Sequence, residues 1–100
     1  MSKVTVVARS QAKPGKEDEV QREFLHLVAE TRKEKGCINY DLHQADDDKS
    51  VFMFYENWVS RGHLDRHAQS VHIAAFRAKS RELLTGPTQI TLWEMLSDAR

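Results

Sequence analysis

Apolar and polar positions along the chain predict four strands. Val4–Arg9 is β-branched and apolar, which is typical of a buried strand. Cys37–Gln44 alternates apolar and polar residues, Val51–Trp58 is apolar on both faces, and Thr88–Leu96 closes the chain as a fourth strand. In the second strand we expect one side to carry Ile38, Tyr40 and Leu42 and the other Asn39, Asp41 and His43.

A helical pattern fills the segments between these strands. Glu17–Arg32 follows Pro14-Gly15, and Gly36 is a plausible C-cap for this helix. Ser60 is the candidate N-cap of a short helix, and Ser70 of a longer one that ends at Gly86-Pro87. The positions that line one face of the first helix are Val20, Phe24, Leu27, Val28 and Thr31.

The order β-α-β-β-α-β predicts an α+β ferredoxin-like fold, with an antiparallel sheet and both helices on one face. We expect residues 1–100 to form a single domain. The other face of the sheet, to which we assign Val4, Val6, Ile90, Leu92 and the third strand, is apolar enough to need cover. Closed two-fold pairing is the commonest oligomer, so we predict a homodimer.

The composition narrows the class of function. The 15 basic and 15 acidic side chains cancel, whereas non-specific binding to nucleic acid or to an anionic membrane needs an excess of positive charge. We therefore expect neither partner. Cys37 is the only cysteine, and the chain has neither a signal-peptide pattern nor a bilayer-spanning apolar run. These features favour a cytoplasmic protein.

Trp58, His67 and His72 are the best candidates for chemistry. An indole can stack on an aromatic ligand and donate a hydrogen bond, and a histidine is the natural base near neutral pH. Each also has a structural interpretation, as a core residue for Trp58 and as surface or interhelical packing for the histidines. His63 and His67 stand one helical turn apart, but no further ligand completes a metal set, so we expect no metal site.

Glu56 shares a strand face with Trp58, and a carboxylate on a largely buried strand needs a partner. It could orient a histidine, or form a buried salt bridge with an arginine such as Arg9 at a dimer seam. The residues that we expect to bind a substrate are Tyr40, Phe54, Tyr55, Glu56 and Phe76.

Several segments, taken together, carry a resemblance to a known family. They are Ala12–Lys16, Thr31–Cys37, Tyr40–Gln44 and Tyr55–Trp58, followed by His67 and His72. The combination resembles the antibiotic biosynthesis monooxygenase family, and within it the small quinol-monooxygenase-like branch. The resemblance runs from Val4 to about Leu96.

The resemblance implies a dimeric α+β barrel that oxidises a small aromatic or quinol substrate with molecular oxygen, without flavin, haem or metal. It also implies that Trp58 is a pocket tryptophan. Such chemistry requires the protein to remove a proton, to hold the oxyanion and to exclude water.

Two departures from the family pattern keep other functions open. Phe54 stands where relatives that oxidise polycyclic phenols have an asparagine, and Val4–Arg9 lacks the asparagine of haem-degrading relatives. The alternatives are an isomerase or a haem-degrading protein on the same scaffold, and a non-catalytic small-molecule-binding stress dimer.

Overall fold

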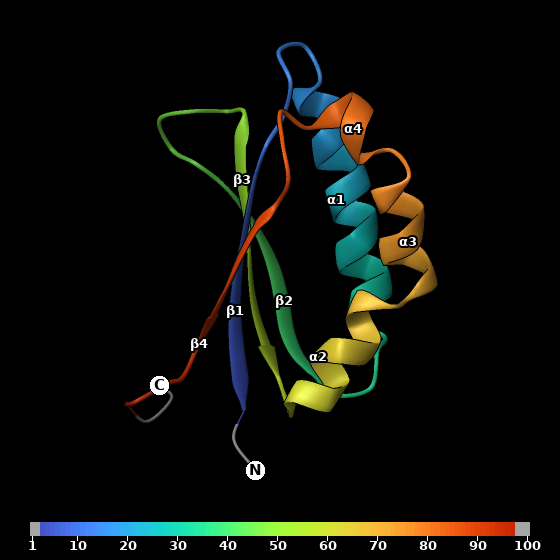
Figure 1. Ribbon diagram of the computed structural model, residues 1–100. Helices are drawn as coiled ribbons and strands as arrows, with labels where there is room; N and C mark the ends of the chain where they lie inside the picture. The colour runs from blue at the N-terminus through green and yellow to red at the C-terminus, as the bar shows by residue number, and fades with distance from the viewer. Residues whose placement is uncertain (1–2, 98–100) are drawn as a thin grey trace.

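The computed structural model, which describes residues 3–97, has all its helices on one face of a four-stranded antiparallel sheet (Figure 1). This is the ferredoxin-like α+β fold that the element order predicts. The strands lie in the order β2-β3-β1-β4. Their bounds are β1 Val4–Gln11, β2 Cys37–Gln44, β3 Val51–Trp58 and β4 Gln89–Trp93. The helices are α1 Glu17–Thr31, α2 Arg61–Ala68, α3 Val71–Arg77 and α4 Ser80–Leu83.

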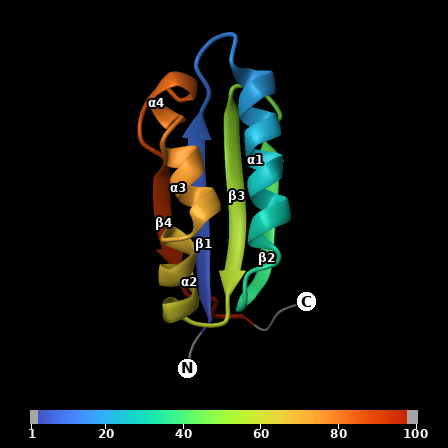
Figure 2. The ribbon, with the colours of Figure 1, turned by 90° about the vertical axis from the view of Figure 1, so that its right-hand side faces the viewer.

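Helix α1 supplies one half of the layer that covers the sheet. The five positions predicted for its inner face are all buried, which confirms the helical pattern. The ring of Phe24 lies 5.8 Å from that of Phe52 and 4.9 Å from that of Phe54, both on β3. These contacts hold α1 over β2 and β3, while α2 and α3 lie over β1 and β4 (Figure 2).

The helical segment after Ser70 differs from the prediction of one long helix. Helix α3 ends at Arg77, and α4 begins at Ser80. Ser80 Oγ donates a hydrogen bond of 2.9 Å to the Arg77 carbonyl oxygen, which satisfies one of the carbonyls at the end of α3. Ser60 and Ser70 cap α2 and α3 as predicted, because each hydroxyl accepts a hydrogen bond from a backbone N–H three residues later.

The assignment of Val4, Val6, Ile90 and Leu92 to the uncovered face was wrong. Val6 pairs with Glu56 on one side and Leu92 on the other, and it is buried beneath the helices. Val7, the next residue along the strand, points to the uncovered face. Side chains alternate between the two faces along a strand. An error of one residue in the predicted facing therefore assigns every side chain to the wrong face.

The start of β2 also departs from simple alternation. The register shifts between Cys37 and Asn39, so that Cys37 faces Trp58 and Ile38 is left out of the ladder, 48% exposed. Cys37 packs against the core, and its burial raises the pKa of the thiol to about 11. Gly36, with φ +85°, lies in the turn that leads into this strand rather than at the end of α1.

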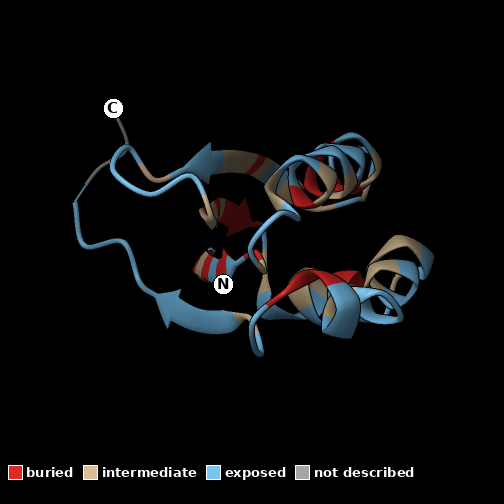
Figure 3. Ribbon diagram, turned by 90° about the horizontal axis from the view of Figure 1, so that it is seen from above, coloured by how far each residue is buried: buried red, intermediate tan, exposed pale blue. Residues whose placement is uncertain are grey.

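Burial is uneven across the sheet (Figure 3). The buried apolar side chains lie between sheet and helices, whereas β4 is exposed along its whole length. Large apolar residues of the segment 90–96 remain in contact with solvent: Ile90, Leu92, Trp93, Met95 and Leu96. Among residues 3–97, the helices are all too short or too polar to cross a bilayer.

Candidate active site

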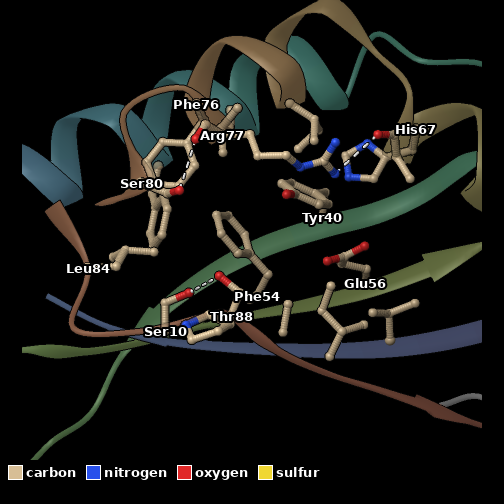
Figure 4. Close-up of a pocket in the computed structure, with 18 of the residues that line it drawn as sticks. Ser10, Tyr40, Phe54, Glu56, His67, Phe76, Arg77, Ser80, Leu84 and Thr88 are labelled. Atoms are coloured by element: carbon tan, nitrogen blue, oxygen red, sulfur yellow. Dashed lines mark hydrogen bonds between the residues drawn. The ribbon is translucent and has the colours of Figure 1, made fainter. Parts of the chain in front are cut away.

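A cavity of about 410 Å³ lies between the sheet and the helices (Figure 4). Its walls are mostly apolar side chains from β1, β3, α1 and α3. An apolar cavity with a few polar groups is the usual form of a small-molecule site. The polar residues that line it are Ser10, Tyr40, Glu56, His67, Arg77, Ser80 and Thr88.

One carboxylate joins two histidines at the edge of this cavity. Glu34 Oε2 lies 2.7 Å from His67 Nδ1 and 2.7 Å from His72 Nε2. His67 is in the last turn of α2 and His72 in the first turn of α3, so the short connection between these helices brings the rings together. Glu34 comes from the turn between α1 and β2. Three separate segments therefore build the cluster.

The surroundings of His67 favour the ionisation state that a general base requires. Burial lowers the pKa of its imidazole, against the opposing effect of Glu34, and so favours the neutral ring. A neutral ring that contacts a carboxylate through Nδ1 carries its proton there and donates it to Glu34. The other ring nitrogen, Nε2, is then an acceptor. Its residue lines the cavity, where a ligand proton could reach it.

Aromatic neighbours fix the orientation of this imidazole. The centre of the His67 ring lies 4.8 Å from that of Trp58 and 5.3 Å from that of Tyr40. The Tyr40 ring in turn stacks on Phe54, with centres 4.7 Å apart. Burial also raises the pKa of the Tyr40 phenol far above its ordinary value, so the hydroxyl stays protonated.

Glu56 is a further ionisable group that lines the cavity. It projects from the sheet, while His67 projects from the helical layer (Figure 4). Burial raises the pKa of Glu56 to about 7, against the hydrogen bond from Trp58, and the negative charge of Glu34 adds to the rise. Trp58 Nε1 donates that bond to Glu56 Oε1 over 2.9 Å. A pKa near neutrality lets this carboxyl hold or release a proton at physiological pH.

The predicted site residues fall into three groups. Those that line the cavity are Tyr40, Phe54, Glu56, Phe76 and His67. His72 does not line the cavity and is linked to it through Glu34 and His67. Trp58 is fully buried behind His67, with its N–H directed to Glu56. Tyr55 pairs with Val7 and Asp41 on the opposite face of the sheet. The roles assigned to these residues stay predictions.

Two residues of the site were missed in the sequence. Glu34 stands among basic residues after the first helix, where it resembles part of a solvated charge run. Arg77, which lines the cavity, lies in a charged stretch of the same kind. The metal pair considered from spacing is not formed, because His63 Nδ1 contacts Ser60 Oγ at 2.8 Å and His67 turns to Glu34.

The fold and the cavity define a class of small α+β proteins, and comparison with known proteins identifies the family. The model of the family "Antibiotic biosynthesis monooxygenase" matches residues 3–79. The chain therefore belongs to this family.

Relatives and solved structures resemble this chain over most of its length. The chain is 35% identical over 98 residues to "Putative monooxygenase Rv0793" of Mycobacterium tuberculosis, covering 98% of this chain and 96% of that protein. It is 29% identical over 92 residues to "Uncharacterized protein sll1783" of Synechocystis, covering 92% of this chain but only 63% of that protein. The crystal structure of PA3566 from Pseudomonas aeruginosa superposes with a TM-score of 0.92 and 33% identity, over 97% of each chain.

Proposed function

We propose that this protein is a cofactor-independent monooxygenase that oxidises a small quinol or phenolic substrate with molecular oxygen. The observation that carries the proposal is the His67 imidazole, which a carboxylate fixes at one nitrogen on the wall of a largely apolar cavity. Membership of the monooxygenase family supports the reaction type. The name of the M. tuberculosis relative points in the same direction.

In the proposed reaction, His67 Nε2 accepts the proton of a substrate hydroxyl. The resulting phenolate is a much stronger electron donor than the phenol, and it can transfer electrons to oxygen without a bound redox group. One oxygen atom enters the ring and the other leaves as water, with all the electrons supplied by the ring. Apolar walls keep solvent from the oxygenated intermediate.

Two further groups can handle protons during this reaction. The protonated Tyr40 hydroxyl is a donor that could stabilise the substrate oxyanion. Glu56, with a pKa of about 7, can deliver a proton to the reduced oxygen and regain it from solvent. A single cavity would thus contain a base, an oxyanion donor and an acid.

Oxygen uptake with a panel of hydroquinones and phenols tests this proposal. We expect uptake without any added cofactor, and a loss of ~100-fold or more in kcat for His67→Asn. Asparagine keeps a donor toward Glu34 but lacks the second ring nitrogen. His43→Asn, on the exposed end of β2, is the matched control and should react like the unaltered protein. Undiminished uptake by His67→Asn would refute the role of this base, and substrate binding without uptake would favour a non-catalytic binding protein.

We also propose that the functional unit is a homodimer. The support is the exposed apolar segment 90–96, in which Ile90 is 64% and Trp93 59% exposed. Ile90 and Leu92 pair with Ala8 and Val6 while Trp93 pairs with Thr5, so both faces of the edge strand β4 expose large apolar side chains. Such exposed side chains often mark an interaction surface. The molar mass in solution, measured by light scattering, should be twice that of the chain, and Trp93→Glu should lower it. A monomeric mass at micromolar concentration would contradict the proposal.

A further inference from the structure

We propose that Glu34, His67 and His72 form a binding site for a divalent transition-metal ion such as Zn²⁺. One ligand atom from each residue lies within 4.8 Å of those from the other two. The sequence does not reveal that these residues lie close together, because His67 and His72 are five positions apart and Glu34 is more than thirty positions away. The site exists only through the packing of α2 and α3 on the turn before β2.

The donor set suits a borderline metal ion. Two imidazole nitrogens and one carboxylate oxygen are the ligands that Zn²⁺, Co²⁺ and Ni²⁺ accept, and three protein ligands leave a coordination position open. The carboxylate supplies one negative charge. Within residues 3–97, Glu34 contacts these two histidines and forms no salt bridge with a lysine or arginine. A divalent cation would therefore not have to displace a competing cation.

The cluster is largely in place for coordination. The Trp58 and Tyr40 rings already hold the His67 imidazole, so little side-chain entropy remains to be lost. Tetrahedral zinc places its ligand atoms roughly 3.3 Å apart, so the two contacts of 2.7 Å must widen by about half an ångström. Glu34 lies in a turn and its side chain is 17% exposed, which leaves it room to move and gives an ion a path in.

Metal binding would change what the site does. An ion bound at His67 Nδ1 takes the lone pair of that nitrogen, so the single proton of the neutral ring must then be on Nε2. Nε2 is the atom that the proposed oxidation uses as its base. The metal-loaded protein should therefore be inactive, which makes the cluster an inhibitory site. This consequence rests on the proposed function, whereas the binding itself does not.

Calorimetric titration of the untagged protein with Zn²⁺ tests the binding, after chelator treatment and removal of the chelator. We expect one ion per chain. His72→Ala should weaken binding by more than the roughly 10- to 100-fold that loss of an outer-shell partner costs. His43→Ala removes an exposed imidazole outside the cluster and should bind like the unaltered protein. Glu34→Gln, which keeps the size of the side chain, is the second variant and should also bind more weakly.

The two parts of the inference can fail separately. Absence of one-to-one binding, or equal affinity in His72→Ala and the unaltered protein, would overturn the site. If binding holds but saturating Zn²⁺ leaves oxygen uptake unchanged, or if uptake requires the metal, the inhibitory role is wrong. If the metal-free protein takes up no oxygen with any substrate while His72→Ala still loses zinc affinity, the metal site stands and the proposed function fails.

Discussion

The stability of this protein should depend on pH through Glu56, and the variant Glu56→Gln isolates that dependence. Glutamine keeps the shape of the side chain and an oxygen that can accept the Trp58 hydrogen bond, but it cannot ionise. In the folded protein the pKa of Glu56 is about 7, against an ordinary value of 4.5. Between these two pH values the folded protein keeps a proton that the unfolded chain has lost. Raising the pH therefore lowers the free energy of unfolding.

The size of the effect follows from the two pKa values. At about 1.36 kcal/mol per pH unit, the interval from 4.5 to about 7 corresponds to about 3 kcal/mol. The Glu56 side chain is almost entirely buried, so solvent screening reduces this little. The unaltered protein should equal Glu56→Gln near pH 4.5 and be about 3 kcal/mol less stable above pH 7.

Another titrating group acts in the same pH range with the opposite sign. Burial lowers the pKa of His67, so its contribution to stability grows as the pH rises through the ordinary value of 6.5. Both proteins contain His67, and its contribution cancels in their difference. The difference between the two curves is therefore the quantity to measure.

Urea unfolding followed by tryptophan fluorescence, at a fixed protein concentration and a series of pH values, measures this difference. Trp58 is buried and provides the signal. Glu82→Gln, on an exposed carboxylate, is the control and should run parallel to the unaltered protein at every pH. A Glu56→Gln curve that also stays parallel from pH 4.5 to 8 would refute the reasoning.

Three further substitutions test the packing around the site by chemical unfolding. Phe24→Ala should cost about 3–5 kcal/mol, because it empties the centre of the aromatic core; a cost below about 1 kcal/mol would contradict this packing. Gly36→Ala should destabilise by more than about 1 kcal/mol, because φ is +85° and the new Cβ would overlap the His63 ring. In Gly86→Ala the new Cβ meets no neighbour, so this variant should lose less stability than Gly36→Ala. Equal losses of stability in the two variants would contradict the turn geometry at Gly36. Ser70→Ala should remove about 1 kcal/mol by deleting the α3 cap, and an unchanged midpoint would show that the cap contributes nothing.

The elements with a strong local pattern were predictable from the sequence. Helix α1 carries its apolar residues at helical spacing, and no competing pattern overlaps it. The facing of β1 was not predictable in the same way. Val4, Val6 and Val7 are all β-branched and apolar, so this strand offers no alternation that shows which side meets the helices. The bulge at Ile38 was not predictable from the sequence either, because the residues on both sides are ordinary strand residues.

The site was predictable only in part. Phe54, Glu56 and Phe76 reach the cavity because the sheet and the long helical pattern position them there. Glu34 could not be found, since its partners depend on how a turn meets two helices more than thirty residues later. Trp58 was identified as a candidate from the sequence. Its complete burial and its hydrogen bond to Glu56 depend on tertiary packing, which the sequence spacing does not reveal.

The position of the cavity has a consequence for the search for a ligand. It occupies the layer between helices and sheet, where the buried core also lies. A molecule that fills it becomes part of that core, and binding adds directly to the free energy of unfolding. At a ligand concentration of about 100 times Kd, the gain is about 2.7 kcal/mol. For a chain of this size that is a rise of roughly 10 to 20 °C in Tm. A thermal-shift screen of quinols and phenols would therefore rank candidate substrates before any turnover is measured.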